Sequence, residues 1–409
     1  MKKFIEIKII SFYLLFVAGV LGFIYMFISP NLLTSSHFLN WDAKHYQWIA
    51  SKGYEGFRVA FFPLFPLIWR FLTVGATGIV IFNSLLFLIS FYFLMKSLQL
   101  KRFETVLYLS IPSFIFFYLP YSESVFFALS VALIWSVRKK LFWLTLLSLF
   151  FCTLSRPAFT ILIPALIVME LVCEKRNFQM VFRIFMYCII SLIAIAIVGL
   201  IQYQDTKKWF KFFSVQEGWG NHLQIPHFPL SSWGGNMIAR LDGVAFIFGL
   251  ISGVCLVLYI LRVNFMKAKS IPKEVILSLA YLGGITLTVF LFRGGALFSL
   301  NRFLFATPFI IMAVNYFLKQ NFSFSNRKLI LILFILIIYW LSFASYVHIQ
   351  AFLKYFAVSV YVVLFFMIKS EHSALRKMAI VSFISVNLFF QVYFYCHFLL
   401  SEGSSGFVG

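Results

Sequence analysis

The sequence predicts an all-α polytopic membrane protein, and its composition, the length of its apolar runs and the placement of its charges support that prediction. Hydrophobic residues make up 62% of the 409 residues and charged residues 11%, which leaves too little polar surface for a soluble globular protein. The apolar runs are about 15 to 23 residues long, a length typical of transmembrane helices and unlike the ten-residue alternation of a membrane β-barrel.

The apolar runs predict about thirteen transmembrane helices. They lie near residues 9–28, 75–95, 104–119, 124–137, 141–155, 158–173, 180–202, 243–261, 273–292, 301–318, 329–347, 352–368 and 378–399. No small-residue cleavage site precedes Pro30, so the first run is expected to stay as an uncleaved span. The five cysteines lie within apolar runs and are odd in number, which favours small hydrophobic residues over a disulfide framework.

The net charge of +21 comes from basic residues that collect on one side of the predicted membrane. Folding the chain back at each apolar run puts 22 of the 34 Lys and Arg residues on the side of Met1. The positive-inside rule assigns that side to the cytoplasm, so the charge follows from topology and does not call for a nucleic-acid partner. These residues fall in seven segments, namely Lys2 to Lys8, Lys96 to Arg102, Arg138 to Lys140, Lys175 to Arg183, Arg262 to Lys273, Lys319 to Lys328 and Lys369 to Lys377.

The first predicted outer segment, residues 30–74, is too long for a simple turn. Asn40 or Asp42 can cap a short helix that runs through Ile49 and stops at Gly53. Trp41, His45, Trp48 and Ile49 are spaced to share one face of that helix. The following run, residues 60–72, is broken by two prolines, so it is expected to lie in the interface with Trp69 and Arg70 at headgroup level.

A second large outer segment, residues 203–242, holds Gln216, Glu217 and Trp219 and is rich in Gly, Pro, Asn and Ser in its second half. That composition predicts an irregular loop lining a site. Further ionisable residues at the outer ends of spans are expected to face something polar, because they are costly at that depth without a partner or ligand. They are Glu123, Arg156, Arg293 and Arg302.

These residues fit glycosyl transfer better than nucleotide chemistry. The sequence has no Asp-x-Asp pair, no dinucleotide or P-loop motif and no metal-ligand spacing, although Asp42 and His45 could in principle share an ion with other residues. A carboxylate such as Asp42 can accept the proton of an attacking hydroxyl, and arginines can hold a departing lipid-linked phosphate. Trp and Tyr rings suit the apolar side of a sugar.

One stretch of the sequence has a specific pattern, formed by Asn40 to Tyr46, Ile49-Ala50, Gly53-Tyr54 and Ala60 to Leu67. Shorter motifs follow at Ser122 to Ser124, Ser155 to Pro157 and Val215 to Glu217 before Trp219. The first pattern resembles the signature WDxxHYxxIAxxGY…AFFPLYPLL of the PIG-V family, the GPI mannosyltransferase 2 group and its prokaryotic relatives, and the shorter motifs are weaker matches to the same family. The resemblance covers roughly residues 10–310.

The resemblance implies a GT-C fold and a glycosyltransferase that uses a polyprenyl- or dolichyl-phosphate mannose donor. It implies Asp42 as catalytic base, inversion at the anomeric carbon, no cofactor and no obligatory metal. Under that hypothesis Arg302, Arg156 and Arg293 bind the donor phosphate, and the substrate contacts come from Trp41, His45, Tyr46, Glu123, Gln216, Glu217 and Trp219.

The same hypothesis divides the chain into a catalytic module, residues 1–318, C-terminal transmembrane helices, 319–400, and a flexible tail, 401–409. The last three spans are expected to be a lipid-facing scaffold. The N-terminus is expected in the cytoplasm and the site on the outer face, in the plasma membrane of a prokaryote or the endoplasmic reticulum of a eukaryote. The expected partners are membrane lipids, the lipid-phosphate donor and a lipid-linked or glycan acceptor.

Other interpretations stay open at the level of sequence. Asp42 can be a helix cap alone, Glu123 and Glu217 can be partners of arginines, and Arg156 and Arg302 can reach headgroups without binding donor. His45 can pack on its own helix. As a whole, the chain can also be a transporter or flippase of lipid-linked sugars, or a non-catalytic subunit on the same fold. The absence of an internal repeat and the crowding of polar residues on one side disfavour a transporter.

Overall fold

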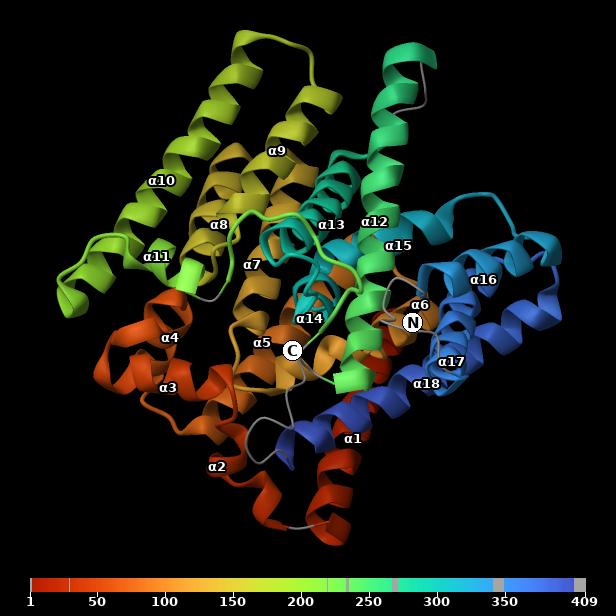
Figure 1. Ribbon diagram of the computed structural model, residues 1–409, viewed down its shortest axis with the longest axis horizontal. Helices are drawn as coiled ribbons and strands as arrows, with labels where there is room; N and C mark the ends of the chain where they lie inside the picture. The colour runs from red at the N-terminus through yellow and green to blue at the C-terminus, as the bar shows by residue number, and fades with distance from the viewer. Residues whose placement is uncertain are drawn as a thin grey trace.

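The computed structural model describes residues 2–28, 30–218, 220–232, 235–266, 271–340 and 349–400. Within these ranges the chain is helical, with two isolated β-bridges and no longer strand (Figure 1). The helices are α1 Lys2–Phe23, η1 Ile24–Ile28, η2 Pro30–Leu33, α2 Ser35–Phe38, α3 Asp42–Lys52, η3 Gly56–Ala60, α4 Leu64–Leu72, α5 Ala76–Leu98, α6 Arg102–Leu109, η4 Pro112–Tyr118, α7 Glu123–Lys139, α8 Phe142–Ser155, α9 Phe159–Cys173, α10 Phe178–Thr206, α11 Lys211–Gly218, α12 Gly235–Met266, α13 Lys273–Phe292, α14 Leu300–Phe305, α15 Pro308–Lys319, α16 Asn326–Trp340, α17 Ile349–Met367 and α18 Ser373–Leu399.

This is an all-α protein with several helices long and apolar enough to cross a membrane. Among the described residues five helices meet that test by length and composition, namely α5, α10, α13, α18 and Leu241–Arg262 of α12. A sixth is counted if η4 and α7, which meet at 106°, form one broken span. Several long apolar helices in one chain make it a multi-pass, membrane-embedded protein.

Within the described residues each predicted span contains helix, but the helix is broken inside two of these spans. Residues 104–119 form α6 and then the 3₁₀-helix η4, because Pro112 cannot continue the α-helical hydrogen bonds. Residues 301–318 form α14 and α15, separated at Ala306 and Thr307 before Pro308. Both predictions of a continuous span are therefore wrong.

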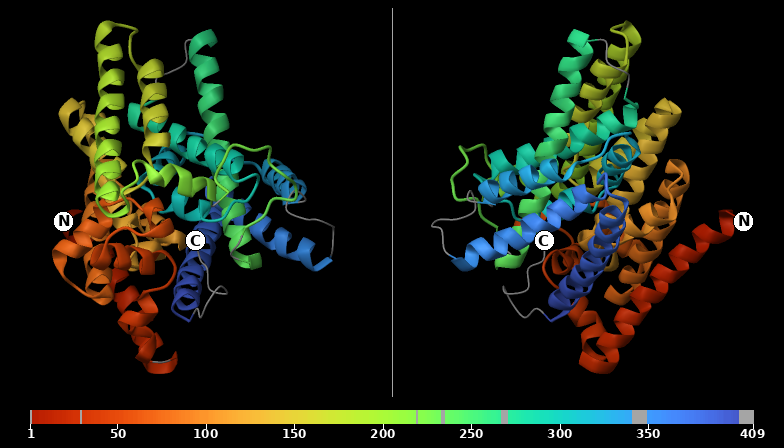
Figure 2. Two further views of the ribbon diagram at one scale, coloured as in Figure 1. Left: turned by 60° about the vertical axis from the view of Figure 1, so that its left-hand side comes forward. Right: turned by 90° about the vertical axis from the view of Figure 1, so that its right-hand side faces the viewer.

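Connectors of the predicted basic side meet one another at one end of the molecule. Arg138 donates to the Ser97 side chain and forms an ion pair with Glu274, and Lys273 pairs with Glu174. Lys319 donates to the Leu98 carbonyl, and Lys369 to the Leu318 carbonyl. Long helices such as α5 and α10 separate this end from the connectors of the predicted outer side, which also meet one another (Figure 2).

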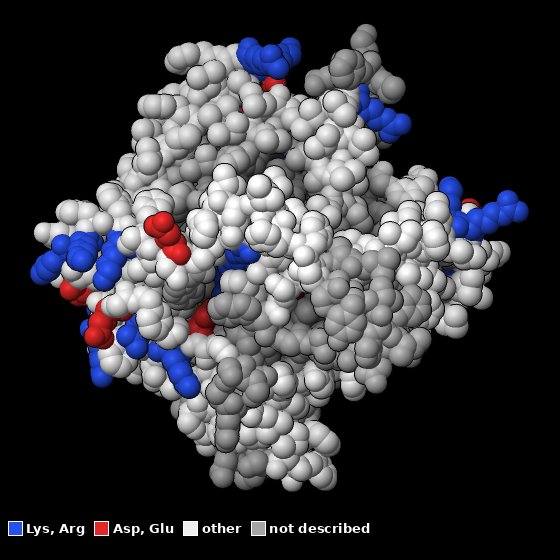
Figure 3. Space-filling view, viewed as in Figure 1, with Lys and Arg blue, Asp and Glu red and all other residues white. Residues whose placement is uncertain are grey.

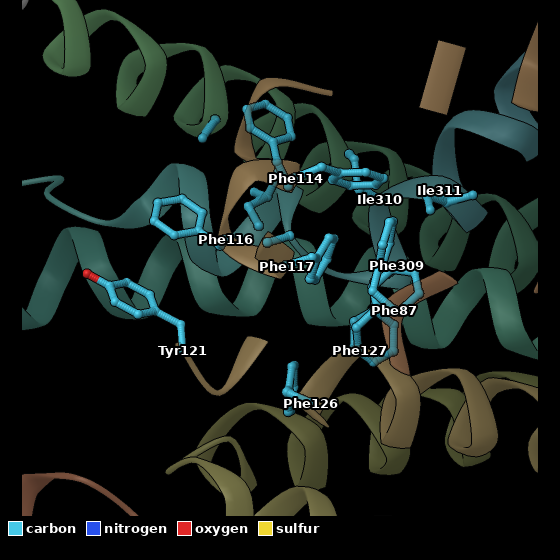
Figure 4. Packing of buried hydrophobic residues seen from close by; sticks show 14 of the residues in the cluster. Phe87, Phe114, Phe116, Phe117, Tyr121, Phe126, Phe127, Phe309, Ile310 and Ile311 are labelled. Carbon is cyan, nitrogen blue, oxygen red and sulfur yellow. The ribbon is translucent and has the colours of Figure 1, made fainter. Parts of the chain in front are cut away.

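The core joins the helices through aromatic side chains and through close helix contact. Phe87 of α5 stacks on Phe117 of η4 at 4.1 Å, and Phe114 and Phe127 pack around them (Figure 4). These rings fix η4, and with it the start of α7, beneath the candidate site.

The helices α12 and α13 cross where each carries glycine. A Cβ atom on Gly283 would lie 2.8 Å from the Cα atom of Gly253, and one on Gly249 would overlap the Thr286 side chain. Small residues therefore allow these two backbones to approach closely, as in other membrane helix pairs.

The first outer segment folds as predicted into short helices, with corrections in detail. Gly53, at φ 87°, ends α3. Trp69 is buried within the protein and donates to the Val74 carbonyl. Arg70 is exposed, and its guanidinium donates to the carbonyls of Ala50 and Ile49 at 2.7 and 2.9 Å. Both acceptors lie in the last turn of α3, where the Ile49 carbonyl also accepts from the Gly53 backbone, so Arg70 holds that end in place.

The last helix is not a purely lipid-facing scaffold. Gln391 of α18 donates to the carbonyls of Leu109 and Ile111 at 2.6 and 2.7 Å, where the chain breaks between α6 and η4. At its C-terminal end the Phe398 and Leu399 carbonyls bind the segment before α3. One face of α18 therefore packs on the protein through polar side chains, and hydropathy does not reveal these inter-helix bonds.

Candidate active site

Asp42 begins α3 but does not cap it. The N-cap residue is Trp41, which makes no side-chain cap bond and has φ 53° and ψ −125°. A non-glycine residue rarely adopts positive φ, and such strain is often found at functional sites. The predictions that Asp42 or Asn40 caps the helix are wrong. The Asn40 amide binds the carbonyls of His37 and Phe398 instead, at 3.0 and 3.2 Å.

The Asp42 carboxylate is part of a network of four charged side chains from four separate parts of the chain. Arg302 of α14 lies 2.7 Å from Asp42 and 2.7 Å from Glu123, and Arg156 lies 2.5 Å from the same Glu123 oxygen. The Glu123 side chain is fully buried and those of Arg302 and Arg156 nearly so, whereas the Asp42 side chain is 21% exposed. Asp42 is therefore the acid of this network that a substrate can reach.

The three arginines predicted to bind phosphate converge on the ring of Phe303. The guanidinium carbons of Arg156, Arg302 and Arg293 lie 5.2, 5.2 and 5.7 Å from its centroid. Cation–π attraction to one ring offsets part of the repulsion between these charges. Chain positions 156, 293 and 302 are thus brought into one positive centre beside Asp42.

Arg293 is the member of this centre with no ion pair closer than 4 Å within the described ranges. Its Nε donates to the Asn221 side chain at 3.0 Å, and Asn221 in turn donates to Gln216 at 2.7 Å. Burial lowers the pKa of Arg293 to about 10, with the charge of Asp242 opposing and that of Arg302 adding to the effect. The guanidinium therefore stays charged at neutral pH.

The irregular second half of the second outer segment lies over this centre, as its composition predicted. Residues 220–232 run along the end of α13, where Gln224 and His227 donate backbone bonds to Leu291 and Gly294. Ser231 forms a parallel bridge with Ala296. In the space-filling view, basic and acidic surface lies side by side in a recess beneath this loop (Figure 3).

His45 and Tyr46 follow Asp42 on different faces of α3. Tyr46 is buried, and its hydroxyl lies 2.9 Å from that of Ser122, beside Glu123. His45 packs against the rings of Phe57 and Phe61, and its Nδ1 atom is buried with no hydrogen-bond partner among the described residues. Burial lowers the pKa of His45 and outweighs the nearby Asp42 charge, so the ring is neutral near pH 7.

The other predicted substrate residues are less close to the network. Trp41 is half-buried at the start of α3, Gln216 reaches Arg293 only through Asn221, and Glu217 is exposed on α11. Trp219 lies outside the described residues. Ile49, predicted to share a face with His45 and Trp48, falls on the buried face with Tyr46.

Three residues near the site had no role in the sequence analysis. Asp242 accepts from Asn301 at 2.7 and 2.8 Å and from Ser232 at 2.6 Å, which joins α12 to the start of α14. Asp205 at the end of α10 accepts from the Tyr54 backbone at 2.7 Å. The sequence could have pointed to both aspartates, because acidic residues are rare in this chain, with only 13 in total. Nothing in the sequence marks Asn301.

Among the residues that the structure describes, no group of three or more His, Cys, Asp or Glu side chains is arranged to hold a metal ion. Comparison of the chain with known proteins finds no match to a family model, to a curated protein or to a solved structure. The function is therefore argued from the chemistry of the site.

Proposed function

We propose that the protein is a membrane glycosyltransferase that moves a hexose, in the first instance mannose, from a polyprenyl-phosphate donor to an acceptor hydroxyl. The observation that carries the proposal is the pairing of a partly exposed carboxylate with a cluster of three guanidinium groups around Phe303. A base beside a positive centre is what transfer with a phosphate leaving group requires. The resemblance to the PIG-V family and its GT-C fold, drawn from the Trp41-Asp42 signature, points to the same chemistry.

In this mechanism Asp42 accepts the proton of the acceptor hydroxyl as its oxygen attacks the anomeric carbon. The bond from that carbon to the phosphate oxygen breaks with inversion, and the polyprenyl phosphate leaves with the electron pair. Arg293 and Arg302 stabilise the charge that develops on the leaving phosphate. Glu123 holds Arg156 and Arg302 in position because it pairs with both.

The test is transfer by purified protein supplied with polyprenyl-phosphate mannose and a panel of lipid extracts, with products identified by mass spectrometry. The Asp42→Asn variant keeps the side-chain volume, and we expect it to bind donor but to lose transfer at least a hundredfold. The matched control is Asp205→Asn, which changes an equally charged residue outside the network. Unchanged turnover in Asp42→Asn would contradict the role of base.

A flippase of lipid-linked sugars is the second candidate, and one observation favours it. The broken pair η4 and α7 bends by 106° directly before Glu123, and discontinuous helices beside buried charges are a device of transporters. The two candidates differ in vesicles that contain donor but no acceptor. A flippase moves a labelled donor between leaflets there, whereas the transferase leaves it in place.

A further inference from the structure

The side of α3 that carries Asp42 continues along the helix as a row of polar and aromatic residues. Asp42, His45, Trp48 and Lys52 are three, three and four positions apart, so they follow one side of the helix. Tyr46 and Ile49, which neighbour this row at four and seven positions after Asp42, are buried. At a rise of 1.5 Å per residue the row is about 15 Å long. It leads from the candidate base to a second group of charges.

Two cations are held together at the far end of this row. The Lys52 Nζ atom and the Arg58 guanidinium carbon each lie 4.1 Å from the centroid of the Trp48 ring. The Phe57 ring lies 5.4 Å from the same guanidinium. Cation–π attraction therefore keeps two like charges near one ring, although they repel each other.

The charge of this pair is only weakly compensated. Glu55 lies 3.7 Å from Arg58, but its side chain is 69% exposed, and an exposed pair of that length contributes little. The Arg58 Nε atom is buried and has no hydrogen-bond partner among the described residues. A buried donor without an acceptor costs free energy that the oxygen of a ligand would recover.

The neighbouring helix adds further positive charge. The helix α11 packs against η3, which carries Arg58, and Lys207, Lys208 and Lys211 lie on α11 and the turn before it. Figure 3 shows basic side chains, with acidic ones among them, at the edge of the molecule where α3 and α11 lie. The field on this surface attracts an anion.

We propose that Lys52, Arg58 and Trp48 form a second site that binds an anionic group, a phosphate or a carboxylate, carried by the acceptor. The acceptor lies along α3 with its reacting hydroxyl at Asp42 and its charge at Lys52 and Arg58. This assignment of an anionic glycan or glycolipid as acceptor rests on the proposed function, whereas the anion site itself does not.

The binding test uses purified protein in neutral detergent, with mannose 6-phosphate and methyl mannoside as paired probes, measured by ligand-detected NMR. We expect mannose 6-phosphate to bind and methyl mannoside to bind at least tenfold more weakly. The double variant Lys52→Gln/Arg58→Gln should lose at least tenfold in affinity for the phosphate sugar. Lys44→Gln, an exposed lysine on the same helix but outside the row, is the matched control and should bind as the wild type does. Lys52→Gln alone, at an exposed position, serves if the double variant does not fold.

Two outcomes would overturn the proposal. One is equal affinity for the two sugars, or an unchanged affinity in the double variant. The other combines two measurements on the double variant, namely weaker binding to vesicles that contain phosphatidylglycerol and an unchanged affinity for mannose 6-phosphate. That result would assign the two cations to lipid headgroups. Asp42→Asn separates the two proposals. It should keep mannose 6-phosphate binding, so retained transfer in that variant removes the proposed base and leaves the anion site standing.

Discussion

At the scale of single residues, the site depends on charges that compensate one another within a largely buried space. Arg302 is the centre of that balance, because it is the only residue in the described ranges that pairs with both Asp42 and Glu123. Removing one partner of a buried ion pair leaves an uncompensated charge, which costs more than the pair itself contributes.

Replacing Arg302 with Met should therefore destabilise the protein by about 3–5 kcal/mol. The physical reason is that the fully buried Glu123 would keep only Arg156, and Asp42 would lose its ion-pair partner. The measurement is thermal unfolding of the detergent-solubilised protein. Glu217→Gln, at an exposed position on α11, is the control and should unfold as the wild type does. A wild-type midpoint in Arg302→Met would show that the network contributes nothing to stability.

His45 makes stability depend on pH with a defined sign. Burial holds its pKa below the usual 6.5 in the folded protein, so the unfolded chain takes up the proton more readily. Its contribution is fully present above about pH 6.5 and is lost as the pH falls through the lowered value. As the pH is lowered from about 7.5 to about 5, the thermal unfolding midpoint of the wild type should thus decrease relative to that of His45→Gln. A difference that stays constant over this range would contradict the prediction.

At the scale of elements, the sequence predicted the positions of helices better than their breaks. Hydropathy located a helix at each apolar run because burial in lipid or core requires the same residue types. It could not locate the interruptions at Pro112 and Pro308, since the freed backbone groups are satisfied by distant partners such as Gln391.

For the candidate site too, the sequence predicted some features and missed others. The signature around Asp42 identified α3, and the outer arginines were expected to face something polar. Their convergence on Phe303 depends on the tertiary packing of α8, α13 and α14, which one sequence does not specify. Trp69 and Arg70 were assigned to headgroups because an amphipathic side chain in an apolar run looks the same in sequence whether it faces lipid or binds another part of the protein. In the structure both side chains donate to backbone carbonyls.

The crossing of α12 and α13 provides a test at this scale. Gly283→Val should destabilise the protein by about 1–3 kcal/mol, because its side chain would meet the Gly253 backbone of α12. Gly22→Ala is the control, since a Cβ atom there meets nothing within 4 Å and glycine is unfavourable inside a helix. Thermal unfolding of both variants is the measurement, and equal midpoints would exclude a tightly packed crossing.

At the scale of the whole molecule, the connectors separate into two ends. Basic segments far apart in sequence bind one another at one end, and the segments that form the candidate site meet at the other. The positive-inside rule then gives an orientation that can be measured.

A cysteine introduced at Lys208 should react with a membrane-impermeant maleimide in intact cells. A cysteine introduced at Lys139 should react only after the membrane is permeabilised, because it belongs to the opposite end. Both lysines are exposed, so accessibility within the protein does not decide the result. The wild-type chain, with its five free cysteines, gives the background. Labelling of the Lys139 cysteine in intact cells would invert the predicted orientation.

The bond from Asn40 to the Phe398 carbonyl joins residues 358 positions apart, two residues before Asp42. During synthesis the loop that carries Asp42 emerges long before α18, so this anchor forms only after α18 has been made. A ribosome that has not yet reached α18 therefore carries a chain whose Asp42 loop still lacks one of its fastenings.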